Sequence, residues 1–281
     1  LAASQETPLQ PALPIIDAHH HFSEHWGGYL PQDLLADGAG HNIVATVYVQ
    51  CGWGYRTNGV EALQPLGETE SVLRVVGADQ QAARTKVAAA IVGFADLRLG
   101  AAVDAVLAAQ VEAGQGRFRG VRNSGAFHGA FKHGVLPRPL EGLYGDASFR
   151  RGYSYLSKHG LSFDAWIYHP QIDEVVDLAR AFPETQLILD HVGGLLGVGP
   201  YEGRADLARD EWRSAMRRLA ACPNVLVKIG GFGTAVFGHD FASRLEPPSS
   251  QALAQAWKPV VHETLEMFGV DRCMFESNFP V

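Results

Sequence analysis

The stretch Ile15-Ile16-Asp17-Ala18-His19-His20-His21-Phe22 decides the fold, because it joins a buried strand to a cluster of reactive side chains. Its β-branched start is typical of a strand. Alternate side chains of a strand share a face, so Asp17, His19 and His21 lie on one face and His20 on the other. His19 and His21 are then about 7 Å apart along the strand. Their ring nitrogens can therefore converge on one ion or one substrate oxygen. The alternative, a surface cluster or tag remnant, lacks such a core-strand pattern before it.

The composition is that of a globular enzyme. The 281 residues are 47% hydrophobic and 19% charged, which is enough apolar material for a substantial core. A net charge of −7 argues against the basic face that nucleic acid or an anionic membrane requires. No Lys or Arg precedes Arg56, and no apolar run approaches the roughly 20 residues of a membrane span. We therefore expect a soluble, cytoplasmic protein that binds neither nucleic acid nor membrane.

The three cysteines, Cys51, Cys222 and Cys273, form no metal-binding or redox pattern. An odd number in a chain of this length indicates a reducing compartment. We interpret the three as small buried hydrophobic residues. Cys51 follows a predicted strand, and a nucleophilic role for it stays open.

Strand-like apolar runs alternate with helical stretches from residue 15 to the end of the chain. Residues 1–14 contain three prolines and no periodicity, which predicts an extended leader. The predicted strands are 15–22, 43–50, 87–97, 118–124, 161–168, 186–194, 224–232 and 272–279. Amphipathic helices are predicted at 101–111, 171–182, 204–222 and 250–268, the last with Ser249 and Ser250 as capping candidates. Eight such units predict parallel pairing and one (β/α)₈ TIM barrel domain over 15–281.

Three further features bear on this barrel. A doubly wound sheet is the alternative, but no glycine-rich phosphate turn follows the first strand. The sequence stops at Val281, directly after the eighth predicted strand, so the eighth outer helix is absent. Further residues of a longer chain, another segment or another subunit would then cover the outer side of this strand. The connections 52–66 and 125–145 are long, and we expect them over the mouth of the barrel.

Polar residues collect at the carboxyl ends of six predicted strands, where the reactive groups of such a barrel stand. These ends carry His19 and His21; Arg122, Asn123 and Ser124; Tyr168 and His169; Asp190 and His191; Lys228; and Glu276, Ser277 and Asn278. In the sixth strand His191 shares a face with the apolar Leu187 and Leu189. We favour His191 as the site residue and Asp190 as its supporting partner.

Each of these side chains has a chemical role and a structural alternative. Arg122 is predicted to hold a carboxylate or a developing oxyanion through its guanidinium group. Lys228 is predicted to do the same or to donate a proton, and a structural ion pair is the alternative for both. His169 is a candidate ligand of substrate or metal, with helix packing as its alternative. His128 and His133 lie in a loop and are predicted to be solvated.

Five motifs of the predicted barrel occur together in one known superfamily. They are Asp17-x-His19-x-His21, Gly120-Val121-Arg122, Leu189-Asp190-His191-x-Gly193-Gly194, Val227-Lys228, and Met274-Phe275-Glu276-Ser277-Asn278-Phe279-Pro280. From residue 15 to the end, the chain resembles the amidohydrolase superfamily in its amidohydrolase 2 branch. It is most similar there to the lactonase-like proteins, which include sugar lactonases, pyrone dicarboxylate hydrolase and sulfomuconolactone hydrolase.

The resemblance implies a TIM-barrel hydrolase in which water attacks the carbonyl of a small lactone, carboxylated or polyhydroxylated. Where a divalent ion is used, zinc above all, the resemblance implies His19, His21 and His191 as its ligands. The ion would polarise the carbonyl and lower the pKa of water. Some members work without a metal, and there the histidines and Arg122 would polarise the carbonyl directly.

At the eighth strand the sequence departs from the superfamily pattern, which has an Asp as ligand and general base. Asn278 stands there, and an amide cannot accept the proton of water. Glu276, on the same strand face, or a histidine would have to act instead. Three functions stay open: a lactone hydrolase, which we favour, a metal-dependent decarboxylase of an unsaturated or aromatic acid, and a degenerate binding protein. The oligomeric state is open as well, and a homo-oligomer fits the sequence.

Overall fold

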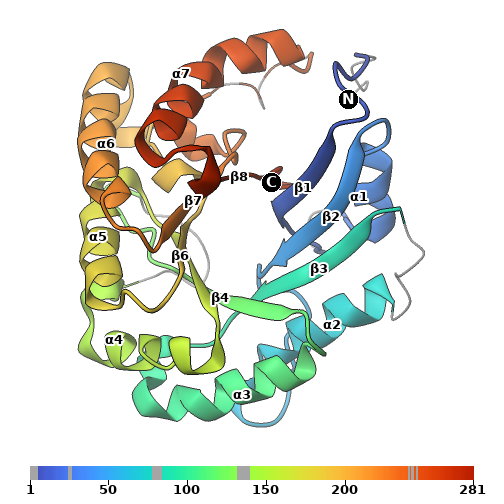
Figure 1. The fold of residues 1–281 in the computed structure, drawn as a ribbon, viewed down its shortest axis with the longest axis vertical. Helices are drawn as coiled ribbons and strands as arrows, with labels where there is room; N and C mark the ends of the chain where they lie inside the picture. Colours follow the sequence, from blue (N-terminus) through green and yellow to red (C-terminus); the bar gives the residue numbers. More distant parts are fainter. Residues whose placement is uncertain are drawn as a thin grey trace.

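A parallel eight-stranded sheet, with its strands in sequence order, forms the centre of the molecule. The computed structural model describes residues 6–24, 27–77, 84–131, 140–239, 241, 244 and 246–281. The strands are β1 (Pro14–His20), β2 (Asn42–Val49), β3 (Lys86–Gly93), β4 (Phe118–Ser124), β5 (Ser162–Trp166), β6 (Leu187–Leu189), β7 (Val225–Ile229) and β8 (Cys273–Phe275). Figure 1 shows that they curve into a ring.

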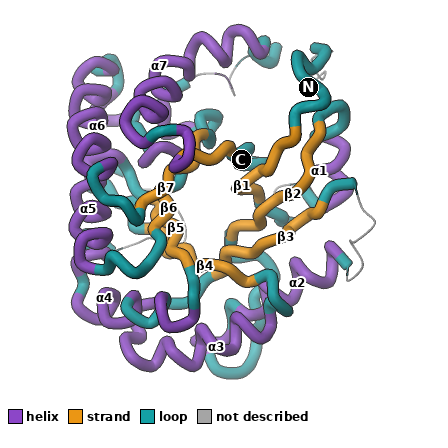
Figure 2. The backbone as a smooth tube through the Cα atoms, in the orientation of Figure 1, coloured by secondary structure: helices purple, strands orange, loops and turns teal. Residues whose placement is uncertain are grey.

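Seven α-helices of the described chain surround this ring. They are α1 (Pro31–Asp37), α2 (Leu66–Val76), α3 (Val103–Ala113), α4 (Ala147–Tyr153), α5 (Ile172–Ala181), α6 (Ala205–Ala220) and α7 (Ser250–Phe268). Figure 2 shows the helices outside the strands. The predicted single-domain (β/α)₈ barrel is therefore confirmed. In the described residues no helix combines the length and the apolar character that crossing a membrane requires.

All eight predicted strands are present, but several end earlier than predicted. The predicted strand 186–194 is only the three residues of β6, because the chain enters left-handed backbone conformations at His191 (φ 52°) and Val192 (φ 48°). Gly231 (φ 66°) and Asn278 (φ 61°) lie in the same region beyond β7 and β8. The carboxyl ends of these strands are thus turns rather than extended chain, which changes where their side chains point.

The predicted helix 250–268 matches α7 at both ends. The Ser249 hydroxyl oxygen accepts the N–H of Ala252 at 3.2 Å, which satisfies one of the unpaired donors at the start of the helix. In α5 the predicted apolar stripe is buried against the sheet through Val175, Leu178 and Ala179. Amphipathic patterning therefore located the helices that cover the barrel.

The segment after β8 closes the barrel against β1. The N–H of Asn278 donates to the His19 carbonyl at 2.9 Å, and the N–H of His21 donates to the Phe279 carbonyl at 2.8 Å. The hydroxyl and N–H of Ser277 donate to the Asp17 carboxylate at 2.6 and 2.8 Å. Figure 1 shows the C-terminus beside β1. This closure brings Glu276 next to the histidines of β1.

Two apolar side chains on the outer faces of β1 and β8 are exposed in the described structure. Ile16 on β1 is 59% exposed and Phe275 on β8 is 54% exposed. Among the described residues no helix follows β8. The prediction that the eighth outer helix is absent from this chain is confirmed.

Candidate active site at the carboxyl ends of the strands

His19 and His21 lie side by side at the end of β1, as their shared strand face predicts. Both are buried, and their Nε2 atoms are 3.2 Å apart. Nδ1 of His21 lies 2.7 Å from the carbonyl oxygen of Val49. Because a carbonyl only accepts, His21 carries its proton on Nδ1 and has the lone pair on Nε2. His20 points the other way, with Nε2 2.8 Å from the Thr46 hydroxyl.

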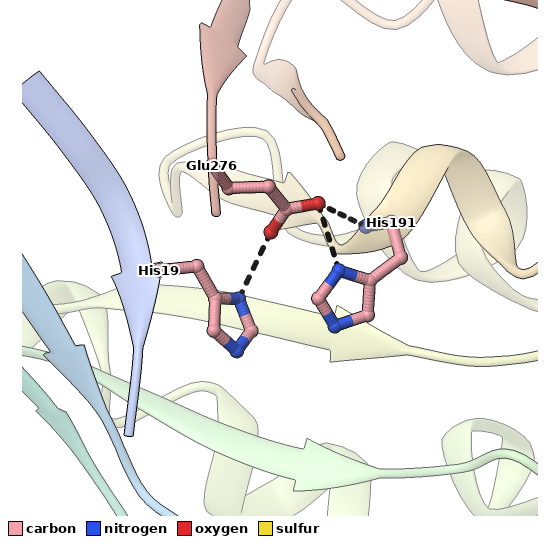
Figure 3. A group of neighbouring side chains, drawn as sticks. All are labelled: His19, His191 and Glu276. Carbon is pink, nitrogen blue, oxygen red and sulfur yellow. Dashed lines mark hydrogen bonds and ion pairs between the residues drawn. The ribbon is translucent and has the colours of Figure 1, made fainter. Parts of the chain in front are cut away.

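Glu276 joins His19 to His191. Oε1 accepts the backbone N–H of His191 at 3.1 Å and lies 2.7 Å from its Nδ1, while Oε2 lies 3.1 Å from Nδ1 of His19 (Figure 3). Burial alone would raise the pKa of Glu276, but His191 and the contact with His19 lower it to about 2. The ligand atoms of these three residues lie within 4.8 Å of one another, so this buried group has the dimensions to hold a metal ion.

Lys228 lies in a buried ion pair with two carboxylates. Its Nζ is 2.5 Å from Oδ2 of Asp164 and 3.1 Å from Oδ1 of Asp190. Burial lowers the pKa of Lys228, but these carboxylates outweigh it and raise the pKa above its usual range. Burial raises the pKa of Asp190, but the Lys228 ammonium and the contact with His19 outweigh it and hold this pKa well below its usual range. The arrangement is the structural ion pair that was the alternative to substrate binding by Lys228.

Arg122 extends from β4 toward His19. Its NH1 lies 3.3 Å from Nε2 of His19 and 3.7 Å from Oδ2 of Asp190, and its NH2 donates to the Gln50 carbonyl. Within the described residues, Nε of Arg122 has no hydrogen-bond partner. A buried donor beside His19 is consistent with the predicted role of Arg122 in binding an anion.

Asn278 is buried beside His19 through its backbone. Its left-handed φ of 61° is a conformation that Asn adopts more readily than most residues. Its side-chain Oδ1 has no hydrogen-bond partner in the described chain. The side chain that replaces the superfamily's Asp is therefore an acceptor without a donor.

His169 is buried at the end of β5 but contacts a different part of the molecule. Its Nδ1 accepts the N–H of Leu196 at 3.1 Å, and its ring packs edge-on against Tyr201 with centroids 4.6 Å apart. Its Nε2 lies 3.7 Å from Glu211 of α6. These partners precede or belong to α6, and none is in the group around His19. The helix-packing alternative describes this position.

His128 and Cys51 make no described hydrogen bond or ion pair with the central group of His19, His191 and Glu276. His128 accepts the N–H of Ala130 through Nδ1 at 3.2 Å. His133 lies outside the described residues. The Cys51 thiol donates to the Phe22 carbonyl, and burial raises the pKa of this thiol to about 12. A thiol with so high a pKa is not a nucleophile at neutral pH.

Sequence reasoning missed two buried acids that shape the site. Asp164 lies between the apolar Phe163 and Ala165, and an acid inside an apolar strand is a signal that could have identified it. Glu68 of α2 is the second. Its Oε1 accepts the N–H groups of residues 51, 52 and 53 at 2.7 to 3.1 Å, which fixes the loop beside His21 and Arg122. Nothing in the pattern of α2 distinguishes Glu68 from a solvated acid.

Comparison with known proteins places this chain in a family. The amidohydrolase family model (Amidohydro_2) matches residues 16–281. The uncharacterized protein y4mH of Sinorhizobium fredii is 34% identical over 254 residues, covering 90% of this chain and 72% of that protein. The L-fucono-1,5-lactonase of Burkholderia multivorans is 27% identical over 279 residues, covering 95% and 82%.

Solved structures agree with this assignment. The crystal structure of a Burkholderia multivorans amidohydrolase with bound zinc has a TM-score of 0.68 and 26% identity, covering 95% of this chain and 85% of that one. The sequence motifs, the barrel and the family match lead to the same conclusion: the chain belongs to the amidohydrolase family.

Proposed function

We propose that the protein hydrolyses a small lactone with the help of a divalent metal ion held by His19, His21 and His191. The observation that carries the proposal is the meeting of imidazole nitrogens from β1 and the β6 turn beside the guanidinium of Arg122. The Nε2 atoms of His19 and His21 are 3.2 Å apart, and the ring centroids of His19 and His191 are 4.6 Å apart. The lactonase named among the relatives and the zinc bound in a related structure support it.

The charges of the site fit a cation. Among the described residues of the central group, three buried carboxylates, those of Asp164, Asp190 and Glu276, face two buried cationic side chains, Lys228 and Arg122. Neither carboxylate oxygen of Asp190 makes a hydrogen bond of proper geometry within the described chain. A buried excess of negative charge is costly unless a cation balances it. When bound, a divalent ion would polarise the lactone carbonyl and lower the pKa of water.

The protein's own side chains orient the substrate. Arg122 has a buried donor available for the carbonyl oxygen or for a carboxylate of the substrate. Glu276 contacts two imidazoles and Asp190 is ion-paired with Lys228, so neither carboxylate is free to accept the proton of water. Water oxygen then bonds to the carbonyl carbon, the ring C–O bond breaks, and the proton passes to the departing alkoxide oxygen. The product is the open hydroxy acid.

A lactone panel tests this function. Purified protein, with and without added Zn²⁺, is incubated with L-fucono-1,5-lactone and with other sugar and carboxylated lactones, and acid release is followed. We expect hydrolysis of at least one lactone and its loss after chelation. His41→Asn, at a solvent-facing histidine, is the matched control for His19→Asn. Release of CO₂ from an unsaturated acid instead would favour the decarboxylase, and zinc binding without any turnover would favour a binding protein.

A further inference from the structure

We propose that Glu276 is a positioning residue, whose carboxylate holds the proton of both His19 and His191 on Nδ1 so that both rings present the Nε2 lone pair to the ion. This inference rests on the metal-dependent function proposed above. It gives Glu276 a role other than the general base that the sequence left open for it. It also explains why one carboxylate contacts histidines from two different strands.

The His191 half of the inference follows from Oε1 of Glu276. This oxygen accepts the backbone N–H of His191 and lies 2.7 Å from Nδ1 of the same residue. An ionised carboxylate only accepts, so the proton is on Nδ1 and the lone pair on Nε2. The backbone of His191 and Val192 is left-handed, a conformation that non-glycine residues keep only where the surroundings enforce it. Glu276 holds both the backbone and the ring of this turn.

Two glycines that follow β7, Gly230 and Gly231, leave room for the contact between Glu276 and His191. A Cβ at Gly230 would lie 2.4 Å from Cγ of Glu276, and a Cβ at Gly231 would lie 2.4 Å from Nδ1 of His191. Any other residue at these two positions would displace the carboxylate or the ring. The two adjacent glycines thus keep Glu276 and His191 in contact.

The His19 half of the inference is decided by the charges around each ring nitrogen. Nδ1 of His19 faces Oε2 of Glu276 at 3.1 Å and Oδ1 of Asp190 at 3.6 Å, against one ammonium, that of Lys228, at 3.2 Å. Nε2 faces the guanidinium of Arg122 at 3.3 Å, which only donates, and the unprotonated Nε2 of His21 at 3.2 Å, which only accepts. Two charged acceptors at Nδ1 outweigh one neutral acceptor at Nε2, and this difference favours the Nδ1–H tautomer. Without Glu276 the charges at Nδ1 would be one carboxylate and one ammonium.

The geometry separates a positioning role from direct ligation by Glu276. The carboxylate oxygens lie 2.7 and 3.1 Å from the two Nδ1 atoms, the spacing of hydrogen bonds. Figure 3 shows the second nitrogen of each ring on the side away from Glu276. A carboxylate that fixes the tautomer of a ligating histidine is a recurrent support of metal sites, and losing it costs about 10- to 100-fold in metal affinity.

The tautomers can be measured on the metal-free protein. Two-bond ¹H–¹⁵N spectra of protein labelled at histidine nitrogens distinguish a protonated from an unprotonated ring nitrogen, and spectra of His19→Gln and His191→Gln assign the two signals. We expect both rings in the native protein to have Nδ1 protonated and Nε2 unprotonated at pH 7. A proton on Nε2 of either ring overturns the proposal. Because no metal or substrate is present, this result is independent of the lactone panel.

Glu276→Gln tests whether Glu276 sets these tautomers. The amide oxygen can still accept from His191, but the amide NH₂ then faces Nδ1 of His19. We expect His191 to keep its tautomer, His19 to move its proton to Nε2, and zinc affinity in chelator competition to fall by about 10- to 100-fold. Glu174→Gln, the same change on α5, is the control and should leave both readouts unchanged. An unchanged His19 tautomer, or zinc-edge absorption showing a carboxylate ligand that the variant loses, overturns the proposal.

Discussion

His169 and His191 make an instructive pair, because they look alike in the sequence and differ in the structure. Each follows a barrel strand, and each is almost fully buried. Nδ1 of His169 accepts an amide N–H, which leaves the proton on Nε2, whereas Nδ1 of His191 faces a carboxylate, which leaves the lone pair on Nε2. Only His191 can therefore offer its outward nitrogen to a cation. The partner of Nδ1, rather than burial or strand position, separates a ligand from a packing residue.

The largest expected effect is that of removing His191. His191→Asn should lower zinc affinity and turnover of the lactone identified by the panel by at least about 100-fold, because losing only a supporting partner already costs about 10- to 100-fold. The measurements are chelator competition and steady-state rates, with far-UV circular dichroism to establish folding. A folded variant that retains native zinc affinity would remove His191 from the metal site and end the contrast with His169.

A second effect, in stability, concerns His169. Burial lowers the pKa of His169 to about 4 from 6.5. Above pH 6.5 the ring is neutral whether folded or unfolded, so pH has no effect through it. Between pH 6.5 and about 4 only the unfolded chain takes up the proton, so the free energy of unfolding falls by about 1.4 kcal/mol per pH unit from this residue. Urea unfolding of the native protein and of His169→Asn at pH 7, 6 and 5 should show the smaller slope in the variant. Equal slopes would mean that His169 titrates normally.

The sequence predicted the parts of this molecule that depend on periodicity. Alternation located eight strands, helical spacing located α7 to the residue, and strand parity paired His19 with His21. The sequence could not predict the tautomer of each histidine. The tautomer depends on partners such as Val49 and Glu276, which are distant in the chain and come close only when the barrel closes.

Parity also failed where strands gave way to turns. Asp190 was predicted as a support behind His191, yet it lies 3.6 Å from His19 and 3.1 Å from Lys228. Asp190 itself keeps extended backbone, with φ −74° and ψ 143°, and the left-handed turn that begins at His191 brings the imidazole to His19 as well. Lys228 was predicted to hold an anion or donate a proton, with a structural ion pair as the alternative, and the partner in that ion pair, Asp164, was not singled out in the sequence. Buried charge networks of this kind join several strands, and no single strand pattern encodes them.

The smallest expected effect is that of His169→Asn on chemistry, and it is the sharpest test of the comparison. The side-chain hydrogen bond, ring contact and ion pair described for His169 are with Leu196, Tyr201 and Glu211, which lie in α6 or the segment before it. Zinc affinity and turnover should therefore stay within about threefold of native, as for changes away from reacting groups. Loss of the buried ring that packs against Tyr201 should instead lower the free energy of unfolding by about 0.5–3 kcal/mol, while the Asn amide oxygen can still accept the Leu196 N–H. The same assays on His191→Asn are the matched measurement. That variant should lose much zinc affinity and turnover and less of the free energy of unfolding. If His169→Asn lost turnover while keeping its stability and zinc, His169 would contact the substrate after all, and the partner of Nδ1 would not be what separates the two histidines.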